Sequence, residues 1–125
     1  MDLYKEELLE HYKNPNNYGI IENPDVTTGE YNPSCGDSVE LTILLTNNVI
    51  SQVKFTGKGC VISQATASML TNTCINRTIE QVLKLDQDFV QKMIGIELGP
   101  NRLKCAMLSL DAVHKGLRVY SVRQK

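Results

Sequence analysis

The sequence predicts an α+β domain in which a small antiparallel sheet of about three strands is covered by helices on one face. Two neighbouring segments within residues 39–55 alternate apolar and polar residues, the period of strands with one buried face. Helical spacing of apolar residues follows over the second half of the chain. At 125 residues we expect a single domain, residues 1–125, with one core and no need of disulfides.

The first predicted element is a helix over residues 2–13. Tyr4, Leu8 and Tyr12 recur at four-residue spacing and are expected to share one face. Pro15 ends this helix, because the residue before a proline avoids helical backbone. A loop rich in Asn, Pro and Gly follows.

The sheet is predicted from a hairpin and one further strand. The apolar positions of the hairpin are Val39, Leu41, Ile43 and Leu45 in its first strand and Val49, Val53 and Phe55 in its second. Asn47 and Asn48 form the turn between them, since asparagine tolerates positive φ. Residues 26–31 are expected to add a third strand at the edge of the hairpin.

A helix over residues 61–71 follows the hairpin, and Cys60 lies at its amino-terminal end. Its many small residues allow a close approach to the sheet. Thr78 and Gln81 have the spacing of a capping box, so a short helix begins there. Asp86 can cap a further helix that runs through residue 93, before a glycine.

The last helix is expected to begin near Leu103. Its apolar stripe comprises Leu103, Met107, Leu110, Val113 and Leu117. Cys105 falls outside this stripe, in the first turn of the predicted helix.

Composition excludes several classes of protein. Lys and Arg total 13 against 14 Asp and Glu, and there is no Trp, so we expect no nucleic-acid binding. The polar, acidic amino terminus and the lack of a long apolar run predict a cytoplasmic protein with no membrane association. The 4 cysteines then indicate thiols, metal ligands or catalysts more than disulfides. The absence of a Cys-x-x-Cys pair argues against a zinc ribbon or a thioredoxin-like site.

Cys35, Cys60 and Cys105 lie where predicted elements begin or end, and such ends converge at one edge of a small domain. Asp37 adds a hard oxygen donor two residues after Cys35. Because a helix start favours anions, Cys60 and Cys105 are expected to be rich in thiolate. The pattern predicts a Cys3Asp metal site.

The ligand types indicate what this site handles. Thiolates select zinc, copper(I) or iron-sulfur clusters. A structural zinc site or a permanent electron-transfer cluster usually has four thiolates. Replacement of one thiolate by the Asp37 carboxylate suits a site that releases its cargo, so we predict a scaffold and not a ferredoxin.

Four segments resemble the U-type iron-sulfur cluster assembly scaffolds, which comprise IscU, SufU and the N-terminal domain of NifU. They are EHYKNPNNYG at residues 10–19, NPSCGD at 32–37, FTGKGCVISQATASML at 55–70 and RLKCAML at 102–108. They occur in the family's order and span nearly the whole chain. The resemblance implies the same α+β architecture.

The resemblance also implies a function and a ligand set. Cys35, Asp37, Cys60 and Cys105 would form the site, and sulfur would arrive as a persulfide from a cysteine desulfurase of the SufS or IscS type. The product would be a transient 2Fe-2S cluster for apo iron-sulfur client proteins, and zinc would occupy the isolated protein. SufU-like members take the persulfide on the equivalent of Cys35, which is our first choice, and IscU-like members favour Cys105.

The chain mixes features of the two branches. Lys104 precedes Cys105, as in SufU-like members, where IscU-like members have His. However, Cys60 and Cys105 are only 45 positions apart, which is too short for the SufU insertion. The segment 98–102, LGPNR, replaces the Leu-Pro-Pro-Val-Lys segment that a dedicated Hsp70 chaperone reads in IscU, which argues against chaperone-driven release.

Several residues have a second interpretation. Asp37 is either a metal ligand or a turn residue. Lys104 is either solvated or lowers a thiol pKa. Cys74 is expected to be core, and His11 to be structural or to face a partner. His114 lies about 14 Å beyond Cys105 along the helix, outside the site.

Three functions therefore compete. The leading one is a cluster scaffold and sulfur acceptor. The second is a zinc-dependent sulfurtransferase that partners a SufS-type desulfurase and builds no cluster. The third is a zinc-stabilised interaction module without sulfur chemistry.

Overall fold

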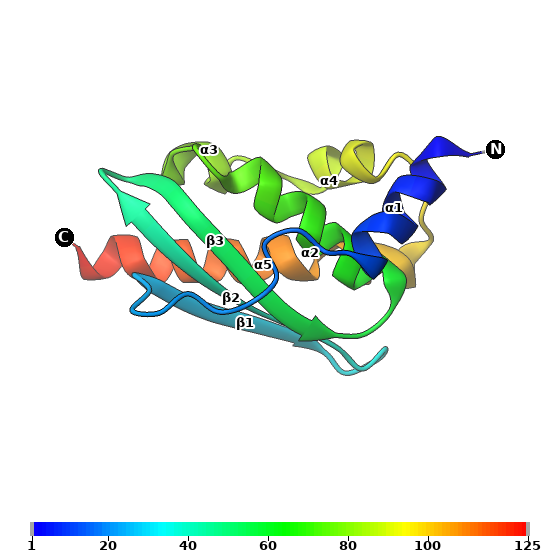
Figure 1. Cartoon of the computed structure of the whole chain (residues 1–125), viewed down its shortest axis with the longest axis horizontal. Coiled ribbons are helices and arrows are strands. Elements are labelled where there is room, and N and C mark those ends of the chain that lie inside the picture. Colours follow the sequence, from blue (N-terminus) through cyan, green and yellow to red (C-terminus); the bar gives the residue numbers. More distant parts are fainter. Residues whose placement is uncertain (1, 125) are drawn as a thin grey trace.

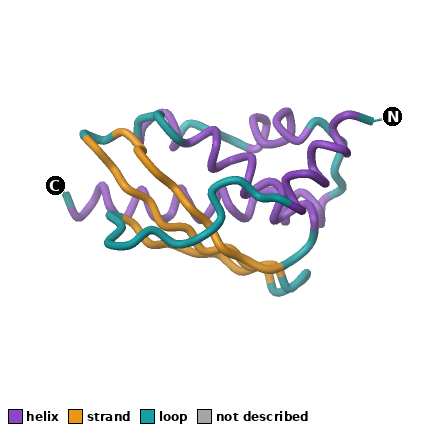
Figure 2. The backbone as a smooth tube through the Cα atoms, viewed as in Figure 1, coloured by secondary structure: helices purple, strands orange, loops and turns teal. Residues whose placement is uncertain are grey.

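Two layers, a sheet and a set of helices, build the structure seen in the computed structural model, which describes residues 2–124 (Figure 1). The elements in chain order are α1 (Leu3–Lys13), β1 (Val26–Asn32), β2 (Asp37–Thr46), β3 (Val49–Lys58), α2 (Val61–Cys74), α3 (Ile79–Leu83), α4 (Gln87–Ile94) and α5 (Pro100–Arg123). Figure 2 shows the helices gathered on one side of the three strands. The predicted α+β class is confirmed.

The sheet has the order β1-β2-β3, and both pairs are antiparallel. Asn47 and Asn48 have φ values of 52° and 63°, the left-handed conformation that a two-residue hairpin turn needs. Leu41 of β2 lies opposite Phe55 of β3, and both are fully buried beneath the helices. The hairpin and the edge strand are therefore present at the predicted residues. The alternation is wrong near the turn, because the register shifts between Leu44 and Leu45. As a result Ile50 is fully buried, whereas Val49 is only half-buried.

Helices α2 and α5 form most of the core with the inner face of the sheet. Both Ala65 and Ala67 of α2 are fully buried. Close packing of α5 on β1 depends on Gly116, since a Cβ there would lie 2.8 Å from side-chain atoms of Val26 and Thr28. No helix formed by residues 2–124 combines the length and apolarity needed to span a bilayer.

The last helix begins earlier than predicted. It starts at Pro100, after Gly99 as the capping residue, because proline is well suited to the first turn of a helix. Cys105 is thus the sixth residue of α5, in its second turn and not its first, and it is only 2% exposed.

The predicted apolar face of the first helix is wrong for two of its three residues. Leu8 is buried, but Tyr4 and Tyr12 are 52% and 42% exposed. The reason is that α1 lies at the rim of the molecule and packs mainly against α2. The ring of Tyr4 instead lies over the backbone of Gly95, where a Cβ would come within 2.1 Å of it.

The loop after α1 covers one edge of the sheet and part of its outer face. The Phe55 amide donates to the Asn17 carbonyl and the Gly19 amide to the Phe55 carbonyl, each at 2.9 Å. The loop then turns over the outer face, where the amide of the buried Ile21 donates to Thr42 Oγ1 at 3.0 Å.

Candidate metal centre

Four sequence-predicted residues meet at one end of the molecule. Figure 1 shows the β1–β2 loop, the β3–α2 connection and the start of α5 at that end. Cys35 lies in the loop and Cys60 caps α2, and both are exposed. Cys105 in α5 and Asp37, the first residue of β2, are buried.

Two distances between candidate ligand atoms match those expected around a tetrahedral metal ion. Zinc–sulfur bonds of about 2.3 Å place two sulfur ligands about 3.8 Å apart, and a sulfur and an oxygen ligand about 3.6 Å apart. Cys35 Sγ and Cys105 Sγ are 3.5 Å apart, and Cys60 Sγ lies 3.8 Å from Asp37 Oδ2. The donor set therefore fits zinc in its chemistry, and these two distances are compatible with its spacing.

One ligand is less closely placed than the others. Ligand atoms of Cys35, Asp37 and Cys105 all lie within 4.8 Å of one another, whereas Cys60 falls outside this cluster and touches it through Asp37. The Cys60 sulfur accepts the Ser63 amide at 3.4 Å, as the N-cap of α2. A complete tetrahedron requires Cys60 Sγ to turn toward the other thiols.

Asn32 shapes the loop that carries Cys35, and sequence reasoning did not single it out. Its carbonyl accepts the amides of Cys35 and Gly36 at 3.3 and 2.9 Å, and its Oδ1 accepts the Ser34 amide at 3.2 Å. Its Nδ2 points at Cys105 Sγ, 3.9 Å away. Asn32 thus links the two neighbouring thiols, and the preference of Asn for turns was the available signal.

The Asp37 carboxylate is fully buried and accepts the Cys60 amide at 2.9 Å. This hydrogen bond joins β2 to the start of α2 across 23 residues, so Asp37 is not a local turn residue. Gly59 lies directly beside the carboxylate and leaves room for it, because a Cβ at this position would lie 2.1 Å from Asp37 Oδ1. The carboxylate is therefore held inside the site by its neighbours.

Gln64 fixes the strand ends beneath the site and was also missed. Its Nε2 donates to the carbonyls of Lys58 and Ser38 at 3.1 and 3.3 Å and to Ser63 Oγ at 3.0 Å. A long amide among the small residues of α2 was the signal that could have identified it. Its contacts hold together the ends of β2 and β3, next to Asp37 and Cys60.

The Gly59→Ala variant should disturb the site more than the fold. Gly59 has φ +143°, and the added methyl group would meet the Asp37 carboxylate and, at 2.9 Å, Ser63 Oγ. We expect zinc affinity, measured by chelator competition, to fall roughly tenfold or more, with a loss of about 1–3 kcal/mol in unfolding free energy. Gly99→Ala at the same end is the control, because a Cβ there contacts nothing within 4 Å. Equal losses of affinity in the two variants would contradict the proposed role of Gly59.

Burial raises the pKa of Cys105, and its contacts with Asp37 and Cys35 act in the same direction. The expectation that Cys105 is rich in thiolate is therefore wrong for the metal-free protein. The physical reason is its place in the second turn of α5, where desolvation of the charged form dominates. The Lys104 side chain is exposed and lines a groove on the far side of the β1–β2 loop, which no cysteine lines.

The remaining cysteine and the histidines lie outside the site. Cys74 is fully buried in the core, as predicted, and burial raises its pKa to about 12 although Arg77 opposes this. His114 bonds to the Val82 carbonyl at 2.8 Å, within the unbroken α5. His11 Nδ1 lies 2.7 Å from Ser68 Oγ and so ties α1 to α2.

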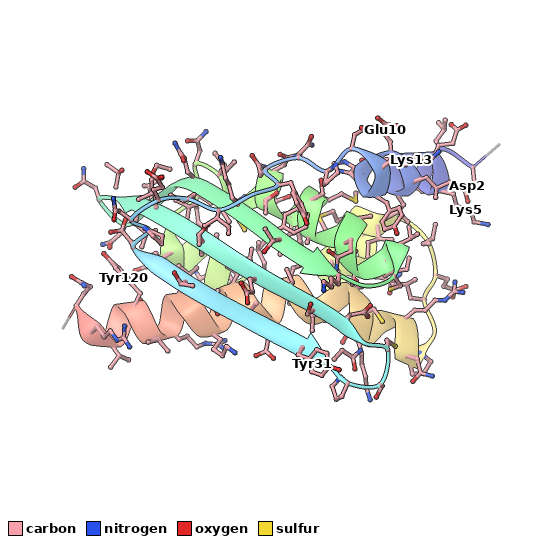
Figure 3. The ribbon with its side chains drawn as sticks, turned by 60° about the horizontal axis from the view of Figure 1, so that its bottom comes forward. Asp2, Lys5, Glu10, Lys13, Tyr31 and Tyr120 are labelled. Carbon is pink, nitrogen blue, oxygen red and sulfur yellow. The ribbon has the colours of Figure 1, made fainter. Side chains whose placement is uncertain are left out.

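An apolar groove of about 570 Å³ opens beside the thiols. It is lined by the three site cysteines together with Leu8, Leu9, Val61, Ile62 and Ile96, and by Lys5, Asn101 and Arg102. Figure 3 labels Lys5 at the amino-terminal end of α1, on this side of the molecule. The groove gives a partner group a route to the thiols from outside.

Known proteins resemble this chain over nearly all of its length. The family model described as NifU-like N terminal domain matches residues 3–125. The zinc-dependent sulfurtransferase SufU of Bacillus subtilis strain 168 is 37% identical, over 92% of this chain and 89% of its own. The iron-sulfur cluster assembly scaffold protein IscU 1 of Archaeoglobus fulgidus is 34% identical, over 94% of this chain and 76% of its own.

A solved structure shares the fold. It is a protein of the thermophile Fervidobacterium islandicum AW-1, described as an iron-sulfur cluster assembly scaffold for the SUF system. It matches with a TM-score of 0.78 and 27% identity, over 90% of this chain and 94% of that one. The alignment with the Bacillus relative spans 132 positions, more than the 125 residues of this chain, so that relative has residues that this chain lacks.

Proposed function

We propose, from the finding that this chain belongs to the NifU-like N terminal domain family, that it is an iron-sulfur cluster assembly scaffold. In this proposal it accepts persulfide sulfur from a cysteine desulfurase of the SufS or IscS type. It then assembles a labile 2Fe-2S cluster and passes that cluster to apo iron-sulfur proteins.

The observation that carries the proposal is the meeting of three thiols and one carboxylate from three separate parts of the fold. Cys35, Asp37, Cys60 and Cys105 are its ligands, and two of the thiols are exposed at the rim. Thiolates bind iron and zinc strongly, whereas a carboxylate is the harder and more exchangeable ligand. Such a mixed set suits a cargo that must leave again.

Cys35 is the sulfur acceptor in this proposal. Its thiolate attacks the terminal sulfur of the donor's persulfide, the donor's sulfur–sulfur bond breaks, and its electron pair stays on the donor cysteine. Cys35 is exposed in a short loop, whereas Cys105 is 2% exposed and burial raises the pKa of its thiol. Attack requires both access and thiolate, so Cys105 is the second choice.

Zinc fits the same four residues in the isolated protein. When bound, it would hold these thiols as thiolates and protect them until sulfur arrives. The chain itself supplies the ordered Cys35 loop and the buried Asp37 carboxylate, which keep the ligands close together.

Sulfur delivery is tested by mass spectrometry after treatment with a SufS-type desulfurase and cysteine. We expect an added mass of one sulfur atom on the peptide that carries Cys35, and a large decrease of that label in Cys35→Ser. Cys74→Ser, which removes a buried thiol outside the site, is the control and should keep the label. Label confined to Cys74 would refute sulfur acceptance at this site.

A zinc-dependent sulfurtransferase that builds no cluster is the second candidate. The 37% identity to a protein of that name favours it, as does Lys104 in place of the His of the IscU branch. Anaerobic reconstitution with iron, cysteine and desulfurase separates the two functions. A coloured cluster that moves to an apo-ferredoxin supports the scaffold, and stimulation of the desulfurase without colour supports the sulfurtransferase. If neither result is obtained, a zinc-stabilised interaction module is the remaining function.

A further inference from the structure

A second concave site lies on the other side of the β3–α2 connection from the apolar groove. We call it the β3 notch; it has a volume of about 430 Å³ and shares no lining residue with the groove. Its lining includes Tyr12, Lys13, Tyr18, Gly57 and Lys58. Figure 3 labels Lys13 at the carboxyl-terminal turn of α1.

The floor of the β3 notch contains an open stretch of sheet edge. Phe55 uses its amide and its carbonyl to pair with the loop at Asn17 and Gly19. Because residues two apart in a strand direct these groups to the same side, the amide and carbonyl of Gly57 also face the edge. Gly19, at φ +139°, turns the loop away over the outer face before it reaches Gly57.

The Gly57 groups therefore have room for a partner. Among residues 2–124 no backbone group outside the β2–β3 pair bonds to Gly57. An open sheet edge of this kind is a template for one more extended segment. The loop at Asn17–Gly19 shows that this same edge accepts one, in the parallel direction at Tyr18 and Phe55.

The walls of the β3 notch specify the chemistry of that segment. Lys13 and Lys58 are exposed, and neither is within salt-bridge distance of an acidic group in the described part of the chain. The nearby Glu10 carboxylate on α1 accepts a hydrogen bond from Asn14 at 3.0 Å. Two unpaired ammonium groups favour a carboxylate between them.

The side chains of Tyr12 and Tyr18 are also exposed, at 42% and 52%. Tyrosine supplies a flat apolar surface with a polar end, and such residues are enriched where proteins meet. Gly57 itself contributes no side chain above the backbone. The combination of open backbone, two tyrosines and two lysines fits a short, acidic, extended peptide.

We propose that the β3 notch binds an extended acidic segment of the sulfur-delivering partner, which adds to the edge of β3 at Gly57 and places a carboxylate near Lys13 and Lys58. This inference rests on the proposed function for the nature of the partner. Gly57 is three residues before Cys60, about 10 Å at about 3.3 Å per residue. A segment bound here would hold the partner beside the thiols while the apolar groove stays open.

The test uses the full chain and a SufS-type cysteine desulfurase. In the Lys13→Glu/Lys58→Glu variant we expect the Kd for the desulfurase to rise tenfold or more, with unchanged zinc affinity. Lys84→Glu/Lys92→Glu changes the same number of exposed charges, at the C-cap of α3 and on α4, away from the notch, and should keep the wild-type Kd. Amide exchange followed by NMR should show the Gly57 amide protected only in the complex.

The outcomes separate the notch from the function. A wild-type Kd in the notch variant, or a Gly57 amide that exchanges as fast in the complex as in the free protein, would refute peptide binding at the β3 notch. Sulfur acceptance by the thiols would then still stand. A wild-type protein that neither binds the desulfurase nor takes sulfur from it would overturn both. A wild-type dimer that the notch variant dissociates would assign this edge to a second copy of the chain and also overturn the proposal.

Discussion

Replacing Cys35, Cys60 or Cys105 with serine is expected to lower zinc affinity by roughly two orders of magnitude. Each thiol lies within 4 Å of another candidate ligand. Each serine substitution therefore replaces one ligand of the same proposed tetrahedron with a hydroxyl, which is a poor ligand for soft metals. The loss should be similar for exposed Cys60 and for buried Cys105, although Cys105→Ser also places a hydroxyl in the core. The measurement is metal content after anaerobic purification, together with chelator competition.

Cys74→Ser is the matched control for this series. Cys74 is fully buried at the end of α2, so serine there should reduce the free energy of unfolding by about 1–3 kcal/mol through an unpaired hydroxyl. Its metal content should stay at the wild-type value. Equal metal content in all four serine variants would refute the assignment of the metal centre to Cys35, Cys60 and Cys105.

The local signals in the sequence predicted most of the fold. The capping box at Thr78 and Gln81 and the cap at Asp86 act within three or four residues, and both helices begin where these residues place them. The Asn47 turn is equally local. Elements of this kind depend on few neighbours, so a pattern in the sequence suffices to locate them.

Two of the wrong predictions are the start of the last helix and the burial of Tyr4. In each case a residue's spacing or motif allows a second structure, and the fold adopts it. Gly99 and Pro100 depart from a family segment, but Gly before Pro is also a helix start, and this places Cys105 in the second turn and not in the predicted first turn. Tyr4 has helical spacing, but its ring contacts Gly95 in another part of the chain and not the core. Spacing alone does not reveal which face finds a partner.

The candidate site shows the same division. The motif around Cys35 and Asp37 identified candidate ligands, because residues able to bind metal are recognisable by type. Asn32 and Gln64 are not ligands, and their importance lies in hydrogen bonds such as that from Asn32 to Cys105, 73 residues away. Such supporting residues become visible only once the fold brings their partners together.

Asp37→Ala is expected to make a reconstituted cluster longer-lived and to slow its transfer to an apo-ferredoxin roughly tenfold. The carboxylate is the hardest ligand of the four, so it is the one that an incoming thiolate displaces most easily. Its burial adds a cost, because the variant leaves the Cys60 amide without its 2.9 Å acceptor. We expect the fold to persist with a loss of about 1–3 kcal/mol in unfolding free energy.

Asp37→Asn separates the two roles of this residue. The amide oxygen can still accept the Cys60 amide, so most of the lost stability should return, while the charged oxygen ligand remains absent. Transfer should therefore stay slow in Asp37→Asn if the carboxylate is the point of entry for incoming thiolates. A wild-type transfer rate in both variants, with stability reduced only in Asp37→Ala, would instead show that Asp37 is a structural link between β2 and α2, and that exchange at this centre proceeds through the thiols alone.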